Sequence, residues 1–414
     1  MDRLAVVERA LRYAAPHELL DALSAALTAQ YAVTGVELLV ADYGMTKLQP
    51  VGRSPHTAAP VSVRATDPGR AFGAQQPYVR TGDHPAATTA HLPVTVRGDR
   101  LGVLSVTLPA DEPTPEALGD LEEIAKVLAH EIVIAERDTD LFLQARRAER
   151  LTLAAEMQWQ LLPGRSCVRP EYAVGAQLEP AYAIHGDNFD WSTSANHLTL
   201  AVTNGMGEGI DAALLTNLGV NALRNARRAG LGLVDQACLA DQALYGQHQG
   251  AAHLSTLLLR FQLDTGAVEI VDAGSPQIWL LRDGTVEAVE PEAQLPLGMF
   301  EDTVYRGQDF QVKSGDRLLF VSDGVYDVAS PTGERYRERA LARALTATRL
   351  LPPAQVPGAV LEELVGHRGD VQADDDAMVV CLDWYGRDEP TSSGTPWGNA
   401  NVHTLRRPSA DGTD

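Results

Sequence analysis

The stretch VTNGMGEG, residues 202–209, places three glycines within five positions directly after a run that has the pattern of a strand. A turn of this kind lets the backbone approach a phosphate group or a metal ion closely, because glycine has no side chain to keep them apart. A dinucleotide site is the weaker alternative. The spacing is GxGxG rather than GxGxxG, and no strand ending in an acid follows about 20 residues later. A metal site is therefore favoured, with Asn204 as the first polar residue of the turn.

Other polar residues suited to metal binding also stand at predicted strand ends. They are Asp187 and Asp190 in HGDNFDWS, Asn204 after HLTLAVT, Asp323 after RLLFVS, and Asp374, Asp375 and Asp376 before AMVVCLDW. In an antiparallel sheet the C-terminal end of one strand lies beside the N-terminal end of its neighbour, so these groups can meet at one edge. A single aspartate after a strand is more often a turn residue. Their gathering within one unit favours a shared site.

Carboxylates held together at such an edge repel one another unless a cation neutralises them. Oxygen ligands without a matching set of histidines or cysteines select hard cations such as Mg²⁺ or Mn²⁺ over zinc. Two such ions, about 3.5–4 Å apart, can activate a water and clamp the oxygens of a phosphoryl group. The pattern therefore predicts two Mn²⁺ or Mg²⁺ ions and phosphoryl chemistry.

The composition limits the partners that this chain can have. Its 414 residues are 45% hydrophobic and 21% charged, and the formal net charge is −21. A chain this acidic would be repelled by nucleic acid and by anionic membranes. We therefore expect neither as a partner. The cysteines Cys167, Cys238 and Cys381 show no CxxC spacing, and neither a signal peptide nor a membrane-spanning run is evident. We expect a cytoplasmic protein.

The chain divides by pattern into four parts. Residues 1–112 are predicted to form a mixed α/β unit, with a strand at 36–42 and a hairpin at 92–108. Residues 113–163 are predicted to be a helical linker, and residues 164–387 change to β-rich runs with inserted helices. Residues 388–414, rich in Pro, Thr, Ser, Gly and Asn, are predicted to be a disordered tail.

The linker leaves two alternatives open. Its apolar stripe, which includes Leu121, Ile124, Leu128 and Ile132, predicts a helix from Thr114 to Leu162, roughly 70 Å long at about 1.5 Å per residue, with a homodimer seam. The other alternative is a pair of shorter helices broken near the charged residues 136–140.

Residues 154–384 resemble the SpoIIE/RsbU-like branch of the PPM (PP2C-type) serine/threonine phosphatases. Seven segments follow the order of that family's motifs: AAEMQWQLLP, HGDNFD, TNGMGEGIDAALL, VDAGSPQIWLLRDG, LPLG, VSDGV and DDDAMVV. The resemblance implies an α+β fold with a two-sheet antiparallel β-sandwich flanked by helices and a binuclear Mn²⁺/Mg²⁺ centre at one edge. It also implies that the enzyme hydrolyses phosphoserine or phosphothreonine in a protein substrate. An anti-sigma-factor antagonist is one possible substrate.

The resemblance carries roles onto particular residues. Asp187, Asp323 and one of Asp375 or Asp376, with Asp376 preferred, correspond to metal ligands of the catalytic centre. Gly205 corresponds to a position whose backbone carbonyl binds metal. Asn204 stands where the family has an aspartate that bridges both ions.

Three positions depart from the family pattern. His185 replaces a glycine and Ser275 replaces a histidine, but neither position binds metal directly in the family. Asn204 offers one neutral carbonyl oxygen in place of a carboxylate, so metal affinity is expected to fall. The alternative to an active phosphatase is therefore a pseudophosphatase that binds phosphoproteins without turnover.

Residues 1–112 resemble a GAF domain through the strand, the irregular middle and the terminal GVLSV hairpin. The resemblance implies a sensory module that binds a small-molecule ligand or dimerises. We expect it to regulate the phosphatase through the helical linker.

Overall fold

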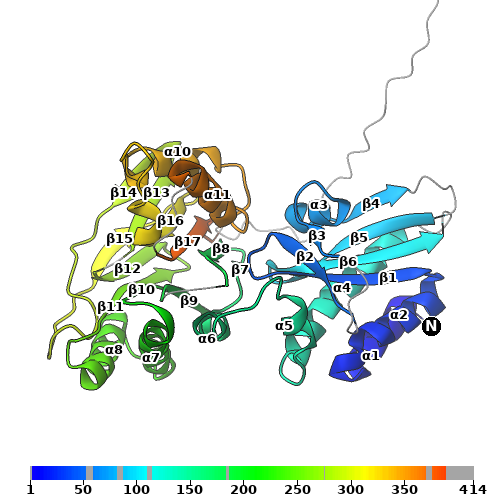
Figure 1. Cartoon of the computed structure of the whole chain (residues 1–414), viewed down its shortest axis with the longest axis horizontal. Coiled ribbons are helices and arrows are strands. Elements are labelled where there is room, and N and C mark those ends of the chain that lie inside the picture. The colour runs from blue at the N-terminus through cyan, green and yellow to red at the C-terminus, as the bar shows by residue number, and fades with distance from the viewer. Residues whose placement is uncertain are drawn as a thin grey trace, which may run out of the picture.

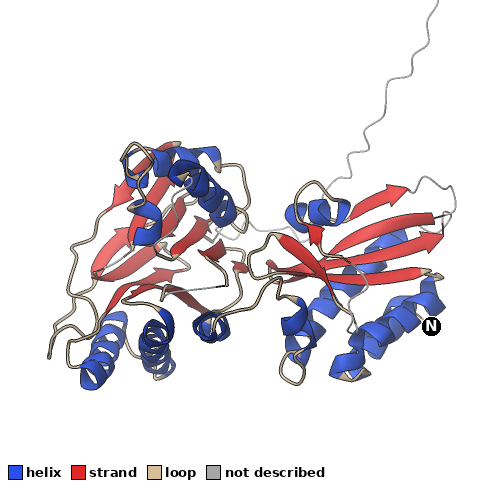
Figure 2. Ribbon diagram, viewed as in Figure 1, coloured by secondary structure: helices blue, strands red, loops and turns tan. Residues whose placement is uncertain are grey.

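The computed structural model describes residues 2–52, 59–81, 87–109, 114–182, 186–274, 276–369 and 375–387. Two units lie side by side, with the short helices α5 (Leu141–Ala145) and α6 (Leu153–Leu161) between them (Figure 1). Each unit combines helices with antiparallel sheet, as Figure 2 shows. The tail predicted at 388–414 lies outside the described residues.

The N-terminal unit is built on an antiparallel sheet with the order β3-β2-β1-β6-β5-β4. Its strands are β1 (Gly35–Ala41), β2 (Lys47–Pro50), β3 (Val61–Ser62), β4 (Tyr78–Thr81), β5 (Ala87–Val96) and β6 (Asp99–Pro109). The strand expected at 36–42 is β1. The expected hairpin is β5–β6, which turns at Arg97 and Gly98, both with positive φ.

Helices cover both faces of this sheet. The helices α1 (Arg3–Tyr13), α2 (Leu19–Tyr31) and α4 (Pro115–Ala135) pack on one face, and α3 (Asp67–Ala74) packs on the other. A short 3-10 turn, Pro16–Glu18, joins α1 to α2. The layers fit the GAF resemblance, which remains a prediction.

The long continuous linker helix is not formed. α4 ends at Ala135 and α5 begins at Leu141, so the break expected near residues 136–140 is confirmed. The alternative was a pair of helices, however, and the segment holds three, because a second break separates α5 from α6 at residues 146–152. The apolar stripe of α4 is buried in the core of the N-terminal unit, through Leu121, Ile124, Leu128 and Ile132. That stripe was the reason to expect a homodimer seam. Packing within the chain already accounts for it, and the homodimer stays a prediction without this support.

The second unit is a sandwich of two antiparallel sheets in the described residues. One has the order β15-β12-β11-β10-β9 and the other the order β14-β13-β16-β17-β8-β7. The strands are β7 (Ser166–Val168), β8 (Tyr172–Glu179), β9 (Asn188–Thr193), β10 (His197–Gly205), β11 (Leu254–Gln262), β12 (Ala267–Ala273), β13 (Gln277–Arg282), β14 (Thr285–Val289), β15 (Gln308–Gln311), β16 (Arg317–Val321) and β17 (Ala377–Trp384).

Three apolar layers hold the second unit together. The central layer lies between the sheets, where Leu200, Leu259 and Phe320 are among its buried side chains. The outer layers join one sheet to α7 (Gly209–Arg228) and α8 (Leu233–His248), and the other to α10 (Ala340–Ala347) and α11 (Val356–Arg368). The short α9 (Asp323–Tyr326) and a 3-10 turn, Tyr336–Glu338, lie between β16 and α10. The predicted flanked β-sandwich is confirmed.

The boundary between the units differs from the predicted one. α4 belongs to the N-terminal unit, whereas α6 contacts α7 and contributes Ala155 to the central layer of the sandwich. α5 also packs in the N-terminal core, through Phe142 and Ala145. The predicted linker 113–163 therefore splits between the units, and residues 146–150 connect them. The reason is that both halves of this segment carry apolar faces, and each face is buried on a different sheet.

Candidate active site

The first half of the site comes from β9 and β10. These strands pair antiparallel, with Asn188 opposite Thr203. Asp187 immediately precedes β9, and Asn204 is near the end of β10, so the register brings both residues to the same edge of their sheet. Asp187 is buried, with 2% of its surface exposed, whereas Asn204 is half-buried.

The second half comes from the other sheet in the same manner. β16 pairs with β17, and Val321 lies opposite Val379. Asp323 follows β16 at the start of α9, and Asp376 immediately precedes β17. Asp376 is fully buried, while Asp323 is half-buried.

Hydrogen bonds join the two halves across the sandwich. The Gly186 N–H donates to Asp376 Oδ2 over 2.8 Å. Asn204 Nδ2 donates to Asp323 Oδ1 over 2.5 Å. Asp187, Asn204, Asp323 and Asp376 therefore converge at one rim, as their positions at strand ends predicted.

The glycines on which the prediction began allow this close approach. A Cβ built on Gly205 would stand 2.6 Å from the Gly186 carbonyl oxygen and 2.6 Å from Thr216 Oγ1 on α7. Thr216 Oγ1 itself donates to the Gly186 carbonyl over 2.7 Å. Gly207 has a φ of 96°, which suits the turn into the helix. Only glycine fits at position 205 without moving the backbone of the site.

The electrostatics of the site centre on Asp187. Burial raises its pKa well above the ordinary value, and the charge of Asp376 raises it further, as do Asp375 and Asp323. A hydrogen bond from Ser322 opposes this rise in pKa. Asp187 Oδ2 is buried and accepts no hydrogen bond from any described residue. A cation placed there would relieve both the repulsion and the missing contact.

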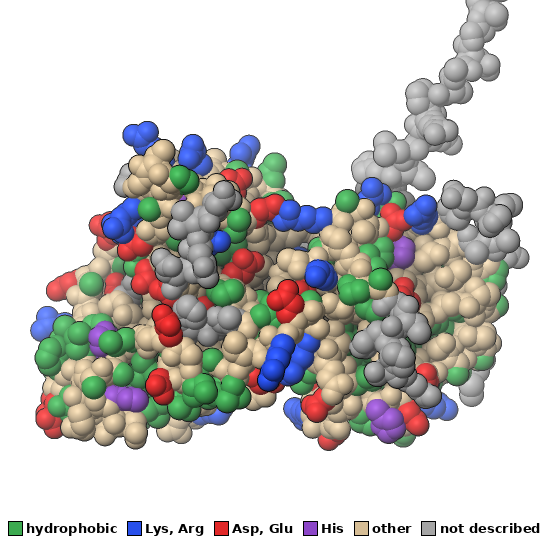
Figure 3. All heavy atoms as spheres, in the orientation of Figure 1, with side chains coloured by type: hydrophobic (Ala, Val, Ile, Leu, Met, Phe, Trp, Pro, Cys, Tyr) green, Lys and Arg blue, Asp and Glu red, His purple; other side chains and the backbone are tan. Residues whose placement is uncertain are grey.

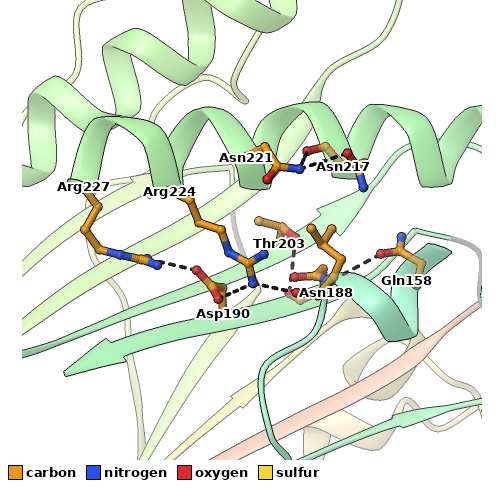
Figure 4. A network of polar contacts seen from close by, with 9 residues as sticks. Gln158, Asn188, Asp190, Thr203, Asn217, Asn221, Arg224 and Arg227 are labelled. Atoms are coloured by element: carbon orange, nitrogen blue, oxygen red, sulfur yellow. Dashed lines mark hydrogen bonds and ion pairs between the residues drawn. The ribbon is translucent and has the colours of Figure 1, made fainter. Parts of the chain in front are cut away.

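Asp190, although named with the other acids, serves a structural purpose. Its carboxylate accepts hydrogen bonds from Arg224 over 2.8 Å and from Arg227 over 2.9 Å, both on α7. Figure 4 shows the two arginines reaching from the helix to Asp190 on β9. This buried ion pair fixes α7 against the sheet and leaves Asp190 outside the acidic rim.

Ser322 is a site residue that sequence reasoning missed. It is fully buried, its hydroxyl accepts a hydrogen bond from the Met378 N–H over 2.9 Å, and it also bonds the Asp187 side chain. The signal was present in the segment VSDGV, where Ser322 precedes Asp323. Its role depends on a side-chain direction that the sequence alone does not give.

The residues fit a hard cation in part. Their donor atoms are oxygens, and Oδ2 of the buried Asp187 has no hydrogen-bond donor among the described residues. Asn204, however, presents its amide N–H to Asp323, and in the described ranges no three His, Cys, Asp or Glu side chains form a ready metal-binding group. Asp375 lies exposed beside the rim, while Asp374, His185 and Ser275 are outside the described residues.

Residues 194–385 match the family model of stage II sporulation protein E, SpoIIE. The second unit is a SpoIIE domain. The match includes Asn204, Asp323 and Asp376 and begins shortly after Asp187. The resemblance to the SpoIIE/RsbU-like phosphatases is thereby confirmed.

Several known proteins are similar to the chain around this SpoIIE domain. Protein IcfG of Synechocystis is 20% identical over 253 residues, which cover 54% of this chain and 40% of IcfG. Phosphoserine phosphatase RsbU of Bacillus subtilis is 20% identical over 261 residues, covering 63% of this chain and 77% of RsbU. This chain thus spans well under half of IcfG but about three quarters of RsbU.

Among solved structures, the RsbU and RsbW domains of Rv1364c from Mycobacterium tuberculosis share 23% identity with this chain. The TM-score is 0.49, and the overlap covers 56% of this chain and 64% of that one.

None of the helices in the described ranges is both long and apolar enough to cross a lipid bilayer.

Proposed function

We propose that the SpoIIE domain is a metal-dependent protein serine/threonine phosphatase. The observation that carries the proposal is the buried Asp187 carboxylate. Its Oδ2 has no donor among the described residues, and its neighbours are further acids. Such a cluster is stable in its charged form only with dications present. Asp187, Asp323, Asp376 and the Gly205 carbonyl would hold Mn²⁺ or Mg²⁺, with Asn204 and Asp375 beside them.

The bound ions would supply an activated water and neutralise charge that develops on the phosphoryl oxygens. The protein contributes the positions of the ligands. Ser322 and the Gly186 N–H hold Asp187 and Asp376, and the Asp190 ion pairs keep α7 against the site. The rim is half-exposed at Asn204 and Asp323, so a phosphorylated side chain on another protein can reach it.

We infer the substrate class from the relatives. The match with RsbU covers 63% of this chain and 77% of RsbU, which is named a phosphoserine phosphatase. A phosphorylated signalling protein, such as an anti-sigma-factor antagonist, is therefore the proposed substrate. The N-terminal GAF-like unit is proposed to regulate this activity in response to a small molecule, in the cytoplasm.

One observation favours a second function. Asn204 Nδ2 donates to Asp323 Oδ1, so an N–H group faces the oxygen that would otherwise bind an ion. With one negative charge fewer, the site holds two dications less tightly. The second candidate is a pseudophosphatase, a module that binds a phosphoprotein without hydrolysing it.

The test compares Mn²⁺-dependent hydrolysis of p-nitrophenyl phosphate by the wild type and by Asn204→Asp. For a phosphatase, we expect turnover in the wild type and Mn²⁺ affinity about tenfold or more higher in the variant. Asn225→Asp, an exposed position of α7, adds the same charge away from the rim and is the matched control. An inert wild type with turnover in Asn204→Asp would establish the pseudophosphatase. Absence of turnover in both, with Mn²⁺ bound, would refute the phosphatase proposal.

A further inference from the structure

A pocket of about 460 Å³ opens at the edge of the SpoIIE domain where β13 begins and β14 ends. Its volume falls in the usual range of ligand pockets, about 300–1,000 Å³. Apolar residues make up most of its lining, and four of them are half-buried or exposed: Trp279, Ala288, Val289 and Pro291. Figure 3 shows hydrophobic, acidic and basic side chains intermixed over β13 and β14, so no charge of one sign dominates there.

Two polar side chains of the pocket are already engaged within the chain. Arg337 pairs with Asp327 over 2.7 Å. The indole Nε1 of Trp279 donates to Gln277 Oε1 over 3.2 Å. Because this hydrogen bond satisfies the polar atom of the indole, its ring is left as an apolar wall. The pocket therefore offers a visiting group apolar contact more than hydrogen bonds.

Two carboxylates also line the pocket. Asp272 is only 5% exposed, so little of its side chain reaches the pocket. Glu290 is exposed, so water can solvate its charge. With Arg337 at the same pocket, neither carboxylate gives the pocket a strong preference for a cation. An uncharged apolar group suits these walls best.

The pocket lies at the same edge of the sheet as the acidic rim. Gln277, which begins β13, lies opposite Val321, and Asp323 follows two residues after Val321. Val289, which ends β14, lies opposite Ile278 of β13. Neighbouring strands of a sheet are about 4.8 Å apart, so the pocket is about 5–10 Å from the end of β16. A protein segment bound at the rim can therefore reach it.

On the basis of the function proposed above, we propose that this pocket binds an apolar side chain of the phosphorylated protein, close in sequence to the phosphorylated residue at the rim. An extended chain advances about 3.3 Å per residue. The pocket would therefore receive the side chain that is about two or three positions from the phosphorylated residue. Such a contact would distinguish one phosphoprotein from another, since the phosphoryl group is common to all of them.

The experiment measures the binding of fluorescein-labelled peptides to the full chain in Mn²⁺ by fluorescence anisotropy. Each peptide carries a non-hydrolysable phosphonate analogue of phosphoserine among alanine and glycine residues. One peptide has no leucine, and the others each have one leucine, two or three positions before or after the analogue. We expect one leucine position to raise the affinity by about tenfold over the leucine-free peptide, as burial of a leucine side chain would do.

Two variants at the exposed Ala288 test the pocket without removing a buried side chain. Ala288→Trp fills the pocket, and Ala288→Asp places a charge in it. In both variants the preferred leucine peptide should bind no better than the leucine-free peptide. Thr285→Trp is the matched control, because Thr285 is exposed on the same strand but outside the pocket. It should keep the preference for leucine.

Hydrolysis of p-nitrophenyl phosphate by the same protein reports separately on the rim. Turnover of this compound without any leucine preference would overturn the pocket proposal and leave the phosphatase standing. A leucine preference in a protein without turnover would support the pocket in a pseudophosphatase. Wild-type leucine preference in both Ala288 variants would overturn the pocket proposal, as would failure of every peptide to bind.

Discussion

Asp323 shows how one residue connects the two interpretations of the site. In this structure its Oδ1 accepts hydrogen bonds from Asn204 and from the Gly324 N–H. In the proposed metal-bound state the same carboxylate would bind a dication instead of these N–H groups. Substituting Asp323 should therefore weaken metal binding while leaving the fold intact.

We predict that Asp323→Ala weakens Mn²⁺ binding by about tenfold or more, because an anionic ligand is lost at a site that already has one charge too few. Calorimetric titration of Mn²⁺ measures this. Asp327→Ala is the matched control, because Asp327 pairs with Arg335 and Arg337 at the surface. Unchanged Mn²⁺ affinity in Asp323→Ala would remove this residue from the site.

Gly324 shows how closely the backbone is packed beside the acids. A Cβ at this position would lie 1.8 Å from the carbonyl oxygen of Asp376. We predict that Gly324→Ala lowers the free energy of unfolding by about 1–3 kcal/mol, because the strands must shift to accommodate the methyl group. Urea denaturation measures the change.

The control for that experiment is Gly366→Ala. Gly366 lies in α11, and nothing stands within 4 Å of a Cβ built there. This substitution should stabilise the protein by about 0.5–1 kcal/mol, because alanine favours helix. Equal changes in the free energy of unfolding for Gly324→Ala and Gly366→Ala would contradict the close packing at Gly324.

At the scale of elements, two ion pairs that share the buried Asp190 anchor α7 to its sheet. Asp190 on β9 is the shared partner of Arg224 and Arg227 on the helix. The first turn of the same helix follows directly on the glycine turn of the site, and Thr216 bonds the Gly186 carbonyl. A loss of this anchor should therefore disturb the site as well as the helix.

We predict that Asp190→Asn destabilises the fold by about 3–5 kcal/mol, since it leaves buried guanidinium groups without their counter-charge. Thermal or urea unfolding followed by circular dichroism measures this. Glu8→Gln, which removes the exposed pair with Arg12, should change stability by about 1 kcal/mol or less. A change in Asp190→Asn no larger than that of the control would show that the helix is held by its apolar face alone.

The elements differ in how well their sequences predict them. β10 and α7 were predictable within a few residues, because one alternates and the other has a helical stripe with arginines at its end. β8 is harder to predict because it is buried on both faces and so lacks the period-two alternation of a half-exposed strand. α8 is harder to predict because its buried face combines two leucines with two alanines and the polar residues Gln236 and Asp241, which gives a weak apolar signal.

The candidate site was predictable to a similar degree. Antiparallel pairing brings Asp187 beside Asn204 in one sheet and Asp323 beside Asp376 in the other. The packing of the two sheets then joins these pairs at one rim. Strand pairing does not predict that Ser322 would reach Asp187, or that the Asn204 amide would turn toward Asp323. Those features depend on side-chain rotamers set by packing.

At the scale of the whole molecule, the units share part of their core. Tyr43 belongs to the N-terminal unit, but it is 4% exposed and packs in the central layer of the SpoIIE domain. The neighbouring Asp42 accepts a hydrogen bond from the Tyr182 hydroxyl over 3.0 Å. Contacts of this kind make the unfolding of one unit depend on the other.

We predict that the wild type unfolds in one calorimetric transition and that Tyr43→Ala separates it into two or lowers its midpoint by several degrees. The loss of a buried aromatic ring costs about 3–5 kcal/mol. Tyr13→Ala, at a position 85% exposed, is the control and should leave the scan unchanged. Two transitions already present in the wild type would contradict thermodynamic coupling of the units.

The placement of Tyr43 has a mechanical consequence. The layer that separates the sheets also fixes the gap that Asp187 and Asn204 on one side keep from Asp323 and Asp376 on the other. The Tyr43 ring, from the N-terminal unit, belongs to the same buried cluster, where it contacts Trp159 and Tyr182. Any movement of the N-terminal unit relative to the SpoIIE domain would therefore have to shift a side chain that packs with the core of that domain.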